Sequence, residues 1–104
     1  MLFINGGRQS GKTSKLIKMC ARNGGYIVCR SKSMCGEIMN MARKMEVSIA
    51  FPLTYEEFIE RRYFGKGISK FYIDDVDALL GYMTTVPIEA VTFTGSYDDG
   101  KAIK

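Results

Sequence analysis

The sequence predicts an α/β domain, a three-layer arrangement in which helices cover both faces of a mainly parallel sheet. The first observation is that short apolar runs of strand length alternate with segments whose apolar residues recur at helical spacing. The second is that a glycine-rich segment follows the first apolar run and two aspartates follow the fourth. Parallel strands would present both at one edge of the sheet. A chain of 104 residues has room for one such domain.

The first half of the chain alternates between strand and helix signals. Asn23-Gly24-Gly25 is expected to end the first helix, and Ser33 is expected to cap the second, which runs to about Lys44. Pro52 should close a short third strand. The expected elements are strands at 1–5, 26–30 and 47–51 and helices at 14–22 and 33–44.

The second half begins with a helix-start signal. Thr54 and Glu57 form a capping-box pattern ahead of a helix that runs to about Arg62. Apart from Glu89, residues 88–94 are apolar or threonine, a content typical of a buried parallel strand. The expected elements are helices at 54–62 and 76–82 and strands at 68–73 and 88–94.

Residues 6–13 match the pattern G-x-x-x-x-G-K-[ST] without a mismatch. Its glycines let backbone N–H groups close around phosphate oxygens, and the following helix directs its positive end to the same anion. Lys12 would reach the β- and γ-phosphates, and the Thr13 hydroxyl would bind Mg²⁺. The sequence therefore predicts a site for ATP or another NTP with Mg²⁺. The expected binding residues are Gly6, Gly7, Arg8, Gln9, Ser10, Gly11, Lys12, Thr13 and Ser14.

Two acidic residues follow the expected strand at 68–73. Asp74 would hold Mg²⁺, normally through water, because this ion keeps several waters in its octahedral shell. Asp75 is the candidate for orienting an attacking water. Thr94, at the end of the last expected strand, should lie at the same edge of the sheet.

These segments resemble those of ASCE-type P-loop ATPases, the class that includes AAA+ proteins, RecA-like proteins and helicases. Ile73-Asp74-Asp75-Val76 is similar to the Walker B segment of DnaA-type AAA+ initiators, and residues 6–13 resemble the Walker A segment of phage terminase large subunits. The layout over residues 1–96 looks like that of small phage-encoded ATP-binding proteins. The resemblance implies a P-loop NTPase core, here expected to stop after the fourth or fifth strand. It also implies catalytic roles for Lys12, Asp75 and Thr94, with Thr94 sensing the γ-phosphate.

Departures from that class predict slow hydrolysis. Most active members carry glutamate where Asp75 stands, and a carboxylate displaced by about 1 Å can cost ~100-fold in rate. The residues after Ser96 are too few for the arginine finger and helical lid of AAA+ proteins. Arg61 and Arg62 are the candidates for supplying such a finger to a second copy of the chain.

Charge is distributed unevenly along the chain. Residues 1–45 hold nine Lys or Arg against one acid, whereas residues 46–104 hold six against ten. Lys15, Lys18 and Arg22 share one face of the first helix, which is either a nucleic-acid contact or simply a solvated surface.

Cysteine and hydropathy patterns limit the remaining possibilities. Three cysteines and no histidine suit neither a disulfide framework nor a zinc site, so we expect reduced, buried thiols in a cytoplasmic protein, the host cytoplasm if it is phage-encoded. No segment approaches the ~18 apolar residues of a membrane helix, so no membrane partner is expected.

Three functions remain open on the sequence alone. The first is a slow or partner-activated ATPase acting in nucleic-acid transactions, alone or as a homo-oligomer. The second is a non-enzymatic nucleotide-binding module that docks on a larger protein machine, with the methionines of 33–44 as a flexible contact face, although packing against a sheet is the other explanation of those methionines. The third is a nucleoside kinase, because thymidine kinases open with a similar loop followed by a Leu-Ile helix, as in Lys15-Leu16-Ile17.

Overall fold

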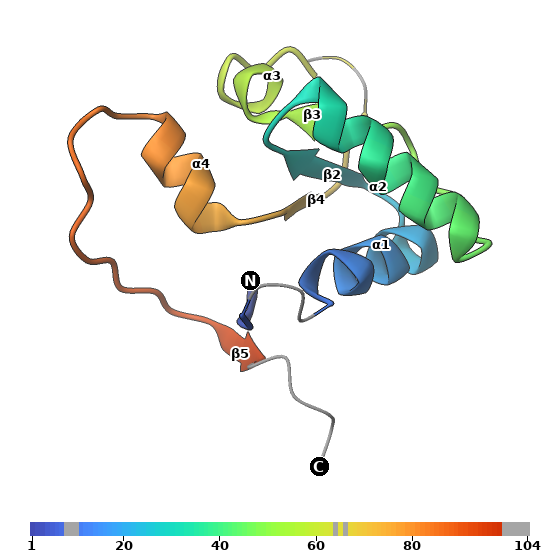
Figure 1. Ribbon diagram of the computed structural model, residues 1–104, viewed down its shortest axis with the longest axis horizontal. Helices are drawn as coiled ribbons and strands as arrows, with labels where there is room; N and C mark the ends of the chain where they lie inside the picture. Colours follow the sequence, from blue (N-terminus) through green and yellow to red (C-terminus); the bar gives the residue numbers. More distant parts are fainter. Residues whose placement is uncertain (8–10, 64, 66, 99–104) are drawn as a thin grey trace.

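A computed structural model describes residues 1–7, 11–63, 65 and 67–98, and these form a small α/β domain (Figure 1). All strand pairs in the described ranges are parallel, as the sequence predicts. In chain order the elements are β1 (Leu2–Ile4), α1 (Lys12–Asn23), β2 (Tyr26–Cys29), α2 (Lys32–Lys44), β3 (Leu53–Thr54), α3 (Tyr55–Ile59), β4 (Phe71–Ile73), α4 (Val76–Tyr82) and β5 (Ser96–Asp98).

The central sheet has the strand order β3-β2-β4, and β2 is its middle strand. Alternate residues of β2 face opposite sides because side chains alternate along a strand. Ile27 and Cys29 belong to a core cluster with α1 and α2, whereas Val28 packs with Leu53, Tyr55 of α3 and Leu79 of α4. Helices therefore cover both faces of this sheet, which confirms the layered arrangement predicted from the alternating pattern.

Capping residues explain where two helices begin. Thr54 and Glu57 make a complete capping box: Glu57 N–H donates to Thr54 Oγ1 at 3.1 Å, and Thr54 N–H donates to Glu57 Oε1 at 2.9 Å. The α2 cap is Ser31, which accepts from Met34 N–H at 3.2 Å, so the prediction of Ser33 was two residues too late. Helix α3 also ends earlier than predicted, at Ile59.

The third strand differs from its prediction. Residues 47–52 have no regular structure, and the strand lies just beyond them, at Leu53–Thr54. Val47 and Ile49 pack instead against the core formed with α1 and α2. Proline is tolerated immediately before a strand because its missing N–H is not needed in the ladder there. Pro52 therefore precedes the strand rather than ending it.

A second, two-stranded sheet pairs β1 with β5, with Leu2 opposite Ser96. The predicted strand at 88–94 was wrong, because residues 86–94 form no strand and Val86, Ile88, Val91 and Phe93 are exposed. Figure 1 shows this orange segment looping away from the central sheet before it returns to β1. A Cβ on Gly95 would collide with the Met1 carbonyl oxygen, so glycine permits the close approach that starts the β1–β5 ladder.

None of the described helices is long and apolar enough to cross a membrane.

Candidate functional site

The contact at the centre of the candidate site joins the start of α1 to the end of β4. The Thr13 hydroxyl donates to the Asp74 carboxylate and lies 3.2 Å from each of its oxygens. Helix α1 begins directly after Gly11, whose φ of 85° belongs to the left-handed region that glycine adopts without strain. Asp74 is the first residue after β4, and its backbone N–H donates to the Val28 carbonyl at 2.9 Å. The sheet and α1 thus place the hydroxyl and the carboxylate together.

Lys12 occupies the first turn of α1 and reaches back over the glycine-rich segment. Its Nζ donates to the Gly6 carbonyl at 2.7 Å and to the Gly7 carbonyl at 3.5 Å. The ammonium group is therefore held next to the backbone of the segment that precedes α1. Ser14 lies in the same turn of the helix. The other three predicted binding residues, Arg8, Gln9 and Ser10, lie outside the described residues.

Asp74 is a buried carboxylate, with 5% of its surface exposed. Burial raises the pKa of its carboxyl above the ordinary value, and the negative charge of Asp75 adds to this increase. The Thr13 hydroxyl and the positive charges of Lys12 and Arg30 act in the opposite direction and lower the same pKa. Any additional positive charge near Asp74 would further favour its ionised form.

Asp75 begins α4 from an unusual backbone conformation. Its φ of 58° and ψ of 72° lie in the left-handed region, which aspartate tolerates better than most residues. The residue is exposed, and its side chain makes no capping hydrogen bond to the helix. Its carboxylate is therefore directed to solvent at the carboxyl edge of the sheet. Strained backbone of this kind is often found at functional sites.

Tyr55 supports the backbone of both aspartates. Only 1% of this side chain is exposed, and its hydroxyl donates to the carbonyl oxygens of Asp74 at 2.6 Å and Asp75 at 3.0 Å. Burial, then the charges of Asp75 and Asp74, raise the pKa of the Tyr55 hydroxyl. Sequence analysis missed this residue. No sequence signal distinguishes Tyr55. It is the first residue of α3, and the strand order β3-β2-β4, which the sequence does not show, brings it to the end of β4.

Arg30 was also missed, although a signal existed. It directly follows β2, just as Asp74 directly follows β4, and the two strands are neighbours with Val28 opposite Ile73. Parallel neighbours present the residues after their carboxyl ends at the same edge. The side chain is exposed and its charge acts on Asp74. A basic residue immediately after an apolar strand is therefore a candidate site residue in the same way as Asp74.

Thr94 does not lie with these residues. It is exposed and precedes β5, and the parallel register of Leu2 with Ser96 places it near the amino ends of β1 and β5. The glycine-rich segment follows the opposite, carboxyl end of β1. The expectation that Thr94 would share one sheet edge with Lys12 and Asp74 depended on a strand at 88–94, which the structure does not contain.

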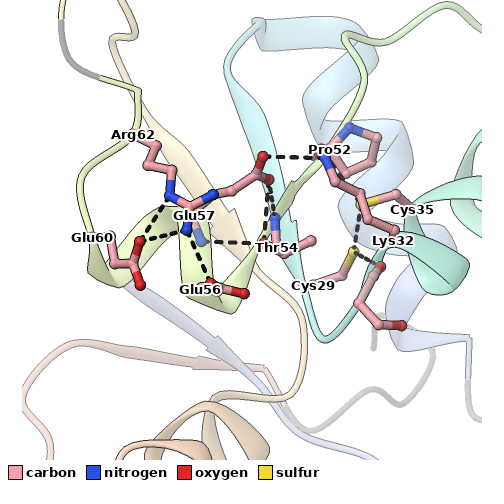
Figure 2. Close-up of polar contacts among 10 residues, drawn as sticks. Cys29, Lys32, Cys35, Pro52, Thr54, Glu56, Glu57, Glu60 and Arg62 are labelled. Atoms are coloured by element: carbon pink, nitrogen blue, oxygen red, sulfur yellow. Dashed lines mark hydrogen bonds and ion pairs between the residues drawn. The ribbon is translucent and has the colours of Figure 1, made fainter.

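A pocket of about 280 Å³ opens beside the site, at the carboxyl ends of β2 and β3. Arg30, Thr54 and Tyr82 contribute to its lining. Two ion-pair groups border it (Figure 2): Lys32 pairs with Glu57 at 3.1 Å, and Arg62 pairs with Glu56 at 2.9 Å and with Glu60. The guanidinium of Arg62 is thus engaged within its own chain. Arg61 is exposed and has a φ of 58°.

The remaining predicted features have ordinary structural roles or an exposed position. The three cysteines are unpaired and buried, and burial together with the neighbouring Cys35 thiol raises the pKa of Cys29 to about 12. Met34, Met41 and Met45 pack against the core, which favours packing over a contact face. On α1, Lys18 and Arg22 are exposed and Lys15 is half-buried.

In the described part of the chain, no three His, Cys, Asp or Glu side chains gather closely enough to hold a metal ion by themselves. A carboxylate at Asp74 and a hydroxyl at Thr13 are nevertheless oxygen donors, the type that Mg²⁺ prefers.

Comparisons of the chain with known protein families, with curated proteins and with solved structures find no match. The function must therefore be inferred from the residues of the candidate site.

Proposed function

We propose that this protein binds a nucleoside triphosphate, ATP or another NTP, together with Mg²⁺ in a P-loop NTPase core, and hydrolyses it slowly. The observation that carries the proposal is the 3.2 Å contact between Thr13 and Asp74, which are 61 residues apart in the sequence. Thr13 follows β1 by way of the glycine-rich segment, which matches a phosphate-binding pattern, and Asp74 directly follows β4. If the glycine-rich segment were only a turn without a binding role, nothing would require these two side chains to lie together.

The binding roles follow from the chemistry of each group. Backbone N–H groups of the glycine-rich segment and the start of α1 would bind phosphate oxygens. The Lys12 ammonium, held 2.7 Å from the Gly6 carbonyl, lies where a small rotation would transfer it to a β- or γ-phosphate oxygen.

The donor set at Thr13 and Asp74 fits Mg²⁺. One hydroxyl and one carboxylate suffice on the protein side, because this ion retains waters and takes further oxygens from the phosphates. When bound, Mg²⁺ supplies positive charge that neutralises the phosphates. The positive charge also offsets the burial of Asp74, whose raised pKa shows that its ionised form is disfavoured without such compensation.

Asp75 is the residue for positioning water. Its carboxylate is exposed and makes no capping bond, so it can accept a hydrogen bond from a water molecule near the γ-phosphate. An aspartate is one methylene shorter than the glutamate of faster enzymes, and the proposal therefore includes a low turnover rate.

The decisive experiment is calorimetric titration of the protein with ATP in the presence of Mg²⁺. The wild type should bind saturably, and Lys12→Ala should weaken binding at least ~10-fold, because a charged contact to phosphate is lost. Lys44→Ala, which removes an equal charge from the exposed far end of α2, is the control and should bind like wild type. Absence of saturable binding by the wild type would sink the proposal.

A second candidate function is a nucleotide-binding module without turnover that docks on another protein. The exposed apolar side chains of Val86, Ile88, Val91 and Phe93 favour it, because a run of this kind suits a protein contact. Measured phosphate release distinguishes the two. Release that stops on Asp75→Asn while ATP binding persists supports hydrolysis, whereas binding without release by the wild type supports the docking module.

Nucleic acid is the proposed activator of hydrolysis, on the strength of exposed Lys18 and Arg22 on α1. ATP turnover measured with and without DNA, in the wild type and in the double variant Lys18→Ala/Arg22→Ala, tests this part separately. Stimulation that the double variant loses supports it, and equal turnover in all four samples contradicts it.

A further inference from the structure

Arg30 lies at the carboxyl edge of the central sheet, next to the strand that carries Asp74. It is the first residue after β2, and β2 pairs with β4 so that Val28 lies opposite Ile73. The ladder extends one step beyond β4, where Asp74 N–H donates to the Val28 carbonyl at 2.9 Å. Continued by two residues, this register would place Arg30 alongside Asp75. The backbone therefore holds an arginine beside the two aspartates at a fixed position, rather than at the end of a loose loop.

The Arg30 side chain is exposed and has no hydrogen bond or ion pair with any described residue. Its neighbours differ in this respect, because Lys32 pairs with Glu57 and Arg62 pairs with Glu56 and Glu60. Arg30 also lines the pocket of about 280 Å³ beside the site, which leaves space for a ligand group against it. A cation that has no hydrogen-bond or ion-pair partner in the described ranges, and that borders the pocket, is available to bind an anion.

The positive charges of Lys12 and Arg30 both act on Asp74. They approach it from different elements, Lys12 from the start of α1 and Arg30 from the end of β2. The phosphate chain of a nucleotide held by residues 6–13 would begin at the α1 side and extend toward the carboxyl ends of β2 and β4. The γ-phosphate would lie farthest toward the ends of β2 and β4, and a nucleoside diphosphate has no γ-phosphate.

We propose that Arg30 binds the terminal phosphate of the bound nucleotide and thereby makes the site prefer a triphosphate over a diphosphate. The inference rests on the proposed function, since it requires the nucleotide to occupy the segment 6–13. Arginine suits the role because its planar guanidinium donates two parallel hydrogen bonds to phosphate oxygens and stays charged at any physiological pH.

The test compares the affinities of Mg²⁺-ATP and Mg²⁺-ADP by calorimetry at one fixed salt concentration. Arg30→Ala should weaken ATP binding ~10-fold and change ADP binding less than ~2-fold, because only ATP carries the third phosphate. Arg30→Lys should recover part of the loss, since lysine keeps the charge but not the fork geometry. Circular dichroism checks that each variant keeps its helices and strands.

Arg43→Ala is the matched control, because it removes the same charge from the opposite end of α2, where Arg43 bonds Asn40. It should leave both affinities unchanged. Equal weakening of ATP and ADP by Arg30→Ala would overturn the inference, as would no weakening of either. Failure of the proposed function is a different result, in which the wild type binds neither nucleotide or Lys12→Ala binds both as well as the wild type.

Discussion

Strand β2 and the segment 86–94 both carry isoleucine and valine but lie in opposite environments. Ile27, Val28 and Cys29 of β2 are fully buried, whereas Ile88 of the later segment is 47% exposed. Strand β2 has a hydrogen-bonded neighbour on each side and helices over both faces, and the later segment has neither. The contrast shows that an apolar run in this chain forms a strand where a neighbouring strand is available to pair with it. Strand propensity thus reflects its neighbours more than its own residues.

The predicted site residues also differ according to whether they belong to the packed central sheet or to the exposed segment 86–94. Asp74, Asp75, Arg30 and Tyr55 all follow or flank the well-packed central sheet, and Thr94 belongs to the exposed segment. Residues placed by the sheet come together, and the residue placed by the exposed segment does not. Packing therefore determines which of the predicted site residues meet.

The largest expected effect comes from the same substitution made in each region. Ile27→Ala should lower the free energy of unfolding by about 3 kcal/mol, because it leaves a cavity in a filled core. Ile88→Ala should change it by less than about 0.5 kcal/mol, because the side chain is 47% exposed. Urea titration followed by circular dichroism measures both.

An equal loss of unfolding free energy in these two variants would show that the segment 86–94 is packed in solution. The contrast between β2 and this segment would then be wrong. If Ile27→Ala does not fold, Ile27→Val provides a milder version, with an expected loss of about 1 kcal/mol.

A smaller effect is expected at the link between α3 and the end of β4. Tyr55→Phe removes the hydroxyl that donates to the Asp74 carbonyl, whereas the Asp75 carbonyl still accepts from Leu79 N–H at 3.1 Å, so the free energy of unfolding should fall by about 1–2 kcal/mol. Tyr82→Phe serves as the control, because Tyr82 is 52% exposed, and should change stability little. A larger loss of stability in Tyr55→Phe than in Tyr82→Phe would show that the contact between α3 and the end of β4 stabilises the protein. A Tyr55→Phe protein as stable as wild type would contradict it.

The smallest effect depends on pH. Because burial raises the pKa of Asp74, folding favours its protonated form. That contribution is fully present below the ordinary pKa and is lost as pH rises through the raised value. Asp74→Asn should therefore melt a few degrees above wild type at pH 7 without nucleotide, and the gap should close as pH falls to about 4.

Glu89→Gln, an exposed change in the segment between α4 and β5, is the control for this pH dependence. It should show no such gap at any pH. A gap for Asp74→Asn that persists unchanged at pH 4 would mean that its origin is not the carboxyl charge.

Local signals predicted much of the fold. The four helices were found from periodicity and from caps, and the Thr54–Glu57 capping box and the bounds of α4 were correct. Strand positions were less predictable, because Leu53–Thr54 rather than 47–51 pairs with β2 for reasons of sheet register. The pairing of β1 with Ser96–Asp98, rather than with residues a little earlier, is likewise a tertiary choice that no local pattern encodes.

Some residues of the candidate site could likewise be predicted from local sequence patterns, and others could not. Thr13 and Asp74 could be named from the sequence, because their connections carry patterns with a chemical reason. Tyr55 could not be ranked above other aromatic residues, since its contact with the end of β4 depends on β2 lying between β3 and β4. Arg30 carried a signal in its place directly after an apolar strand, but the pairing of β2 with β4 had to be known before Asp74 could be named as its neighbour. The sequence motifs identified the two side chains that meet in the candidate site, Thr13 and Asp74. The residues that support or surround them are revealed by the strand order.

The Tyr55 hydroxyl has one further consequence, which concerns how the protein can be observed. The chain contains six tyrosines and no tryptophan, so its intrinsic fluorescence is tyrosine emission. Because the hydroxyl of Tyr55 is bonded to the carbonyl oxygens of Asp74 and Asp75, any backbone shift at these aspartates alters the surroundings of one emitting ring. The difference between the wild-type and Tyr55→Phe spectra isolates that ring. The protein therefore carries its own optical reporter at the carboxyl edge of β4, without an added label.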